Sequence, residues 1–100
     1  MRERLRADLL AAMKAKDETR LKVLRSLSAA LGNAEAVDPS TVPDGQTEVA
    51  RRQLTDEDVR SVIDAERAEL DAAAAELDAN GRTAEADALR QRRRVLDRYV

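Results

Sequence analysis

Apolar residues recur along the chain at helical spacing and predict four helices. The first is expected over residues 2–16 and the second over about 18–36, with a break at Lys16–Asp17, where Asp17 can cap the second helix. A third helix is expected over about 55–79 and a fourth over about 83–98. Because neither glycine nor proline separates the first two helices, a single bent helix is the alternative.

The second predicted helix carries an unusually wide apolar face. At 100° per residue its apolar side chains spread over about half of the circumference, whereas a surface helix normally shows a narrower stripe. We therefore expect this helix to touch two neighbours and to be central, with Lys22 on its outer face and Arg25 at the margin. The apolar set is Leu21, Val23, Leu24, Leu27, Ala30, Leu31 and Ala34.

Capping signals delimit the third and fourth helices. Thr55 and Asp58 have the spacing of a capping box, Gly81 can take the left-handed conformation that ends a helix, and Thr83 can cap the next one. So short a connection predicts an antiparallel αα-hairpin over about 55–98, packed on the helix pair 2–36. The acidic run 56–58 fits the first turn of a helix better than a metal site.

Both prolines and a Pro-Asp-Gly turn signal fall between the second and third predicted helices. This composition predicts a flexible loop at 37–50. The prediction is therefore an all-α, four-helix antiparallel domain that occupies residues 1–100 as a single unit.

Two charged residues interrupt the apolar stripes of the predicted hairpin: Glu66 on the third helix and Arg92 on the fourth. With the chain folded back at Gly81, they lie within about one turn of each other. We expect an ion pair between them, the alternative being that each side chain reaches solvent separately.

The composition of the chain limits the catalytic and metal-binding chemistry that its side chains can perform. The chain has no cysteine and no histidine, and Tyr99 is its only aromatic residue. The commonest general base, metal ligand and nucleophile partners are therefore missing. No segment approaches the ~18 apolar residues of a transmembrane helix. We expect a cytoplasmic protein without cofactor, metal site or membrane partner.

Charge is distributed unevenly around the net value of −2. Residues 1–31 carry eight basic and four acidic side chains, residues 32–80 carry four and thirteen, and residues 81–100 carry six and three. Two interpretations remain open: the basic segments attract an acidic partner, or they pack beside the acidic segment within one domain.

Several short motifs stand in the first third of the chain and near its end. The early ones are Met13-Lys14-Ala15-Lys16-Asp17, Arg20-Leu21, Leu24-Arg25 and Asn33-Ala34-Glu35; later come Gly81-Arg82, Val95-Leu96 and Tyr99. Together they resemble the YqeY-like family. The resemblance covers nearly the whole chain. It implies an all-helical domain similar to the tail domain of the B subunit of the aspartyl/glutamyl-tRNA amidotransferase.

The chain also departs from the family pattern. The family continues beyond the position of Tyr99 into a second small helical subdomain, so the expected match is to the first subdomain only. Ala68, Leu70 and Ala73 stand where the family usually carries a basic segment, and Arg92 stands where it is usually acidic.

In the amidotransferase, such a tail implies tRNA contact without catalysis. The resemblance therefore implies a non-catalytic accessory module that contacts tRNA or an amidotransferase complex. The alternative is a helical protein–protein interaction domain or homodimer without nucleic-acid binding, and independent catalysis is the least favoured hypothesis. No catalytic residue and no small-molecule substrate is assigned. The candidate nucleic-acid-binding residues are Lys14, Lys16, Arg20, Lys22, Arg25 and Arg82.

Overall fold

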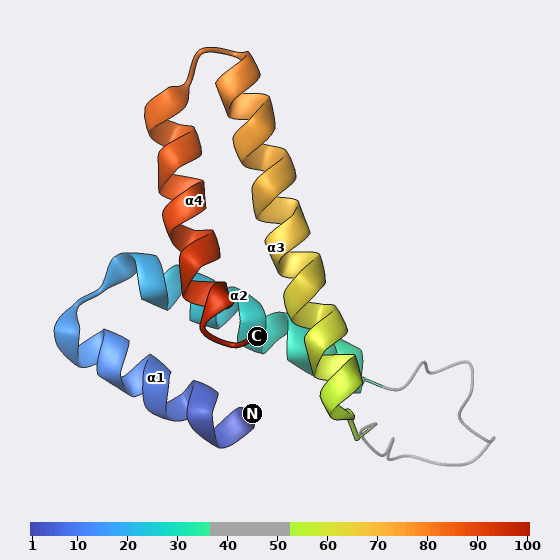
Figure 1. Cartoon of the computed structure of the whole chain (residues 1–100). Coiled ribbons are helices and arrows are strands. Elements are labelled where there is room, and N and C mark those ends of the chain that lie inside the picture. The colour runs from blue at the N-terminus through green and yellow to red at the C-terminus, as the bar shows by residue number, and fades with distance from the viewer. Residues whose placement is uncertain (37–52) are drawn as a thin grey trace, which may run out of the picture.

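Helices account for almost all of the structure in the described part of the chain. The computed structural model describes residues 1–36 and 53–100, which form α1 (Arg2–Ala15), α2 (Glu18–Glu35), α3 (Asp56–Ala79) and α4 (Thr83–Asp97) (Figure 1). The predicted all-α, four-helix fold is confirmed. The loop predicted at 37–50 lies outside the described residues.

The first two helices are separate, with the predicted break at Lys16–Asp17. Lys16 ends α1 in the left-handed conformation, with φ 54° and ψ 38°, and its N–H bonds back to the carbonyl of Met13 at 3.2 Å. Asp17 then caps α2, because its Oδ1 accepts a hydrogen bond from the backbone N–H of Arg20 at 3.1 Å. This elbow reverses the chain and lays α1 against α2.

The start of α3 is also as predicted. Thr55 Oγ1 accepts from the Asp58 N–H at 3.1 Å, and Asp58 Oδ2 accepts from the Thr55 N–H at 3.0 Å, which completes the capping box. Asp58, one of the three acidic residues of this first turn, is thus used in capping. Among the described residues, no three carboxylates gather closely enough to hold a metal ion.

The hairpin turn is partly as predicted. Gly81 has φ 74°, in the left-handed region, and the Arg82 N–H closes the turn on the carbonyl of Leu77 at 2.8 Å. The predicted cap by Thr83 is wrong. Thr83 is already helical, because the turn brings the chain into the helix one residue earlier, and Arg82 occupies the capping position without a side-chain capping bond.

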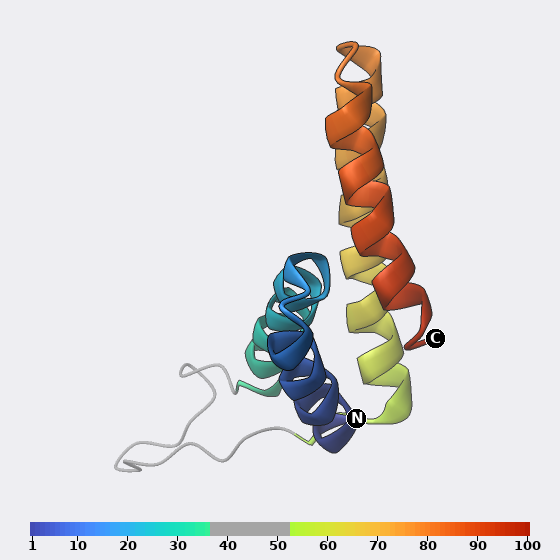
Figure 2. The same cartoon turned by 90° about the vertical axis from the view of Figure 1, so that its left-hand side faces the viewer.

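The core is built around α2, as its wide apolar face predicted. This helix packs against α1, α3 and α4. Figure 2 shows that α1 and α2 lie on one side of the α3–α4 hairpin and that the hairpin extends well beyond them. The largest fully buried side chains come from all four helices: Leu5, Leu24, Leu27, Leu31, Ile63 and Leu96.

No helix of the described residues is long and apolar enough to cross a membrane. The aliphatic core instead faces neighbouring helices of the same chain. Its only aromatic member is Tyr99, just beyond α4.

Candidate functional site

A groove of about 350 Å³ opens where the N-terminal end of α2 approaches the second half of α4. Two segments far apart in the sequence therefore share one surface hollow. The lining residues are Asp17, Thr19 and Arg20 from the elbow and α2, and Gln91, Arg94, Val95 and Arg98 from α4 and its end.

Three guanidinium groups distinguish this groove. Arg20 is half-buried, whereas Arg94 and Arg98 are exposed. None of the three forms an ion pair with any residue of the described segments. Asp17 is the one carboxylate in the lining, and it is engaged in capping α2. The groove therefore presents more positive than negative charge, a property suited to an anionic ligand.

Local structure places these arginines. The Asp17 cap fixes the first turn of α2, and with it the position of Arg20. Arg94 and Arg98 are four residues apart, so they project from neighbouring turns on one side of the helix. Arginine is well suited to phosphate, because its planar guanidinium offers two parallel N–H donors.

The end of α4 is tied to α1 by a set of contacts around Tyr99, which we call the C-terminal latch. The Tyr99 hydroxyl donates to Asp8 Oδ2, and the guanidinium carbon of Arg4 lies 4.4 Å from the centre of the Tyr99 ring. Arg4 also donates to the carbonyl of Arg98 at 2.6 Å. The C-terminal latch thereby holds the backbone of Arg98, whose side chain lines the groove.

The same contacts perturb the titration of Tyr99. Burial, followed by the hydrogen bond to Asp8 and the charge of that carboxylate, raises the pKa of Tyr99 to about 12. The positive charges of Arg4 and Arg20 oppose this shift. Tyr99 therefore stays neutral at physiological pH and acts in the latch as a hydrogen-bond donor.

The structure brings together only part of the candidate set predicted from the sequence. Arg20 lines the groove, and Lys16 lies close by in the elbow. Lys14 is exposed at the end of α1, and Lys22 and Arg25 are exposed on α2, outside the groove lining. Arg82 lies in the turn between α3 and α4 and pairs with Glu85 at 2.7 Å.

Sequence reasoning missed Arg94 and Arg98. The available signal was their four-residue spacing, which separates them from the side of α4 that carries Arg93. The run Arg92–Arg94 alone suggests only that positive charge is spread around the helix. Because the N-terminal end of α2 lies beside the face of α4 that carries Arg94 and Arg98, only that face lines the groove.

The backbone of Lys16 adds a second feature to this end of the molecule. Among the described residues, it is the one non-glycine residue with positive φ. The left-handed conformation costs a side-chain-bearing residue about 1–3 kcal/mol, and such residues concentrate at functional sites. A lysine at this strained position is presented on the elbow, next to the groove.

Comparison with known proteins identifies the family. A family model described as "Yqey-like protein" matches residues 2–100. The chain belongs to the YqeY-like family. No curated protein and no solved structure matches this YqeY-like chain.

A larger cavity of about 450 Å³ lies elsewhere in the YqeY-like fold, between the N-terminus, the end of α2 and the start of α3. Its charged lining includes Arg2 and Glu35, which form an ion pair with each other. Opposite charges thus meet within that wall, whereas the arginines of the α2–α4 groove have no ion-pair partner among residues 1–36 and 53–100. The groove is therefore the better candidate for an anion site.

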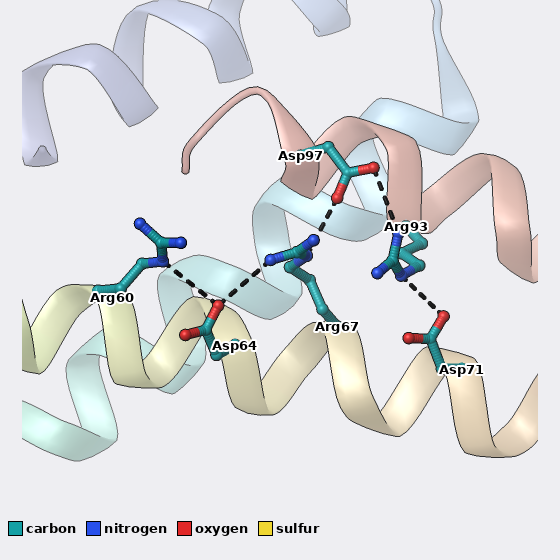
Figure 3. A network of polar contacts seen from close by, with 6 residues as sticks. All are labelled: Arg60, Asp64, Arg67, Asp71, Arg93 and Asp97. Carbon is teal, nitrogen blue, oxygen red and sulfur yellow. Dashed lines mark hydrogen bonds and ion pairs between the residues drawn. The ribbon is translucent and has the colours of Figure 1, made fainter.

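Other arginines of the YqeY-like hairpin are bound in a network between α3 and α4 (Figure 3). Arg67 Nε lies 3.0 Å from Asp97 Oδ1, and Arg93 Nε lies 2.7 Å from Asp71 Oδ1. Neither Nε forms a hydrogen bond within the described residues, so these contacts are ion pairs. Two further contacts extend the network, from Arg93 to Asp97 at 3.4 Å and from Arg67 to Asp64 at 3.3 Å.

The predicted Glu66–Arg92 ion pair is not formed. Glu66 Oε2 instead accepts a hydrogen bond from Ser26 Oγ at 2.9 Å, so this side of α3 faces α2 rather than α4. Arg92 makes no ion pair with any described residue. Ion pairs join the two helices of the hairpin instead through Arg67 and Arg93, the residues that follow Glu66 and Arg92, and through Arg90, which pairs with Asp78.

Proposed function

We propose that this YqeY-like protein is a non-catalytic accessory module that binds nucleic acid, with tRNA or a tRNA-dependent amidotransferase complex as its partner. The observation that carries the proposal is the α2–α4 groove, where Arg20, Arg94 and Arg98 converge without ion-pair partners in the described structure. Phosphate is the anion best matched by several guanidinium groups. The motif resemblance to the amidotransferase tail domain supports tRNA as the nucleic acid.

The chemistry of the groove also supports binding without catalysis. The whole chain has neither histidine nor cysteine. Thr19 is the only hydroxyl in the groove lining, and the one carboxylate there, Asp17, is engaged in capping α2. An activated nucleophile needs a base within hydrogen-bonding distance, and the lining offers no such pair.

A binding titration with labelled tRNA tests the proposal. Phosphate contacts release counterions, so the affinity should fall between about 50 mM and about 200 mM salt. Three contacts correspond to a slope of about −2 to −3 in a plot of log affinity against log salt concentration. Absence of binding at the lower salt concentration would refute the proposed function.

A matched pair of triple variants locates the site. The groove variant carries Arg20→Gln, Arg94→Gln and Arg98→Gln. The control carries Arg60→Gln, Arg82→Gln and Arg90→Gln, which remove the same charge from arginines that are already ion-paired. The groove variant should lose affinity and most of the salt dependence, and the control should keep both. Equal losses would show that only net charge matters.

The outer half of the hairpin favours a second candidate function, a helical protein-interaction or dimerisation domain. Leu70 packs against the core, but Leu77 and Leu89, further towards the tip, do not belong to it. Both leucines are only half-buried. Sedimentation of the protein at high concentration tests for a dimer, and a strict monomer contradicts that form of the hypothesis.

A further inference from the structure

The groove offers phosphate contacts but no aromatic side chain on which an unpaired base could stack. Tyr99 is the only aromatic residue of the whole chain, and it is 9% exposed. Its ring is covered by Arg4 and its hydroxyl is bonded to Asp8. Proteins that bind single strands gain about 1–3 kcal/mol per base from aromatic stacking. This protein lacks that source of affinity.

The backbone that carries the cations of the groove is held in place at both sides. Arg94 belongs to α4 and Arg98 follows it directly, where the C-terminal latch ties the backbone to α1. Arg20 lies in the first turn of α2, which is fixed by the Asp17 cap. Cations spaced along an ordered backbone suit a ligand whose phosphates are already ordered. A flexible single strand would first have to lose conformational entropy, with no stacking to compensate.

Two neutral polar side chains lie beside these cations. Thr19 brings a hydroxyl and Gln91 an amide to the same groove. Both groups can donate and accept hydrogen bonds, as a ribose 2′-hydroxyl also can. Double-helical RNA displays its 2′-hydroxyls along a wide and shallow minor groove, beside the phosphates. DNA has no such group.

We propose that the α2–α4 groove binds the backbone of a double-helical RNA stem, through phosphates at Arg20, Arg94 and Arg98 and through 2′-hydroxyls at Thr19 and Gln91. This inference rests on the proposed function and specifies its ligand. Recognition follows the shape and backbone of the stem and depends little on base sequence. An RNA that is folded into stems is the natural partner of such a site.

Four labelled probes test the ligand class with the full chain at about 50 mM salt. The first is an RNA stem-loop, and the second is one arm of its stem as an unpaired strand. The third is a DNA stem-loop of the same sequence, and the fourth is an RNA stem-loop with a different sequence of base pairs. We expect the two RNA stems to bind alike, and both to bind about tenfold more tightly than the single strand. The DNA stem should bind more weakly than the RNA stem.

The Gln91→Ala variant then separates a 2′-hydroxyl contact from a structural role. Gln91 is exposed on α4, where alanine favours the helix. The variant should lose affinity for the RNA stem and keep its affinity for the DNA stem. The ratio of the RNA affinity to the DNA affinity should therefore fall towards one. A loss for both probes contradicts a 2′-hydroxyl contact.

The outcomes distinguish the two proposals. Equal or tighter binding of the single strand overturns the stem assignment and leaves nucleic-acid binding standing. Binding that differs between the two RNA stem sequences also overturns it, because a backbone contact carries no sequence information. Failure of every probe to bind removes the proposed function itself.

Discussion

Arg93 and Arg94 are neighbours in α4, yet they belong to two different regions of the molecule. Arg93 turns towards α3, where it lies 2.7 Å from Asp71, and it also contacts Asp97 of its own helix at 3.4 Å (Figure 3). Arg94 turns towards the N-terminal end of α2 and lines the groove without an ion pair to any described residue. One residue step rotates a helical side chain by about 100°. That rotation separates an arginine that joins two helices from one that is available to a ligand.

The comparison suggests that the two groups of arginines have different roles, one in folding and the other in ligand binding. Those between α3 and α4 are neutralised by carboxylates and contribute to folding. We expect those of the groove to contribute little to folding, because they form no ion pair with any described residue. The division can be tested by changing one region at a time while both stability and nucleic-acid affinity are measured.

Removal of the Asp97 carboxylate, which contacts both Arg67 and Arg93, should give the largest loss of stability. Asp97→Ala deprives Arg67 and Arg93 of a common partner, and these side chains are only 23% and 33% exposed. We expect a loss of about 2 kcal/mol, below the cost of a fully buried pair because water still reaches the site. Relief of the unfavourable helix dipole at Asp97 reduces the loss and is included in this figure.

Chemical denaturation measures the loss, with Asp87→Ala as the control. Asp87 also pairs with an arginine, Arg90, but its side chain is 62% exposed. Its removal should cost less than about 0.5 kcal/mol. Equal losses for the two variants would contradict a special contribution from the network.

The neighbouring arginines themselves provide the next test. Arg93→Gln should lower stability by about 1 kcal/mol and leave the affinity for the RNA stem unchanged. Arg94→Gln should change stability by less than about 0.5 kcal/mol and weaken RNA binding roughly tenfold, through loss of one charge-assisted contact. The two measurements are thermal denaturation and fluorescence anisotropy. If Arg93→Gln weakened binding as much as Arg94→Gln, the proposed division would be wrong.

The C-terminal latch connects the two regions, and Tyr99→Phe tests its contribution. Loss of the hydroxyl that donates to Asp8 should cost about 1 kcal/mol near neutral pH, because Asp8 stays partly solvated. RNA affinity should fall only modestly, since Arg98 loses part of its support but keeps its charge. Denaturant titrations of both proteins measure the difference.

The same variant makes a prediction about alkaline pH. The folded-state pKa of Tyr99, about 12, lies above its ordinary value of 10.0, so folding favours the neutral hydroxyl. The stabilisation is complete below pH 10 and is lost as the pH rises towards 12. The advantage of the wild type over Tyr99→Phe should therefore shrink across that interval. A constant difference from pH 9 to pH 12 would contradict the raised pKa.

Most of the fold could be predicted from the sequence because its signals are local. The caps at Asp17 and Thr55 and the left-handed Gly81 each depend on a few consecutive residues. The wide apolar face of α2 likewise indicated a central helix with two packing partners, and the structure adds a third. Thr83 was misassigned by one position because the turn enters the helix early, a level of detail that capping preferences do not resolve.

The candidate site was less predictable because it depends on how helices approach one another. Arg20 was identified within a basic segment, but its partners Arg94 and Arg98 lie more than seventy residues away in the sequence. The Glu66–Arg92 prediction failed for the same reason. Periodicity placed both residues on inward-facing stripes, but only packing shows that Glu66 meets Ser26 of α2.

The smallest expected effect concerns an arginine that is paired but exposed. Arg60 lies at the end of the hairpin network, 3.4 Å from Asp64, and its side chain is 57% exposed. An exposed pair four residues apart on one helix contributes only about 0.3–0.5 kcal/mol. Arg60→Gln should therefore cost less than about 0.5 kcal/mol and leave RNA binding unchanged, as denaturation and anisotropy can measure. A cost equal to that of Arg93→Gln would mean that pairing alone, and not partial burial between two helices, sets an arginine's contribution to stability.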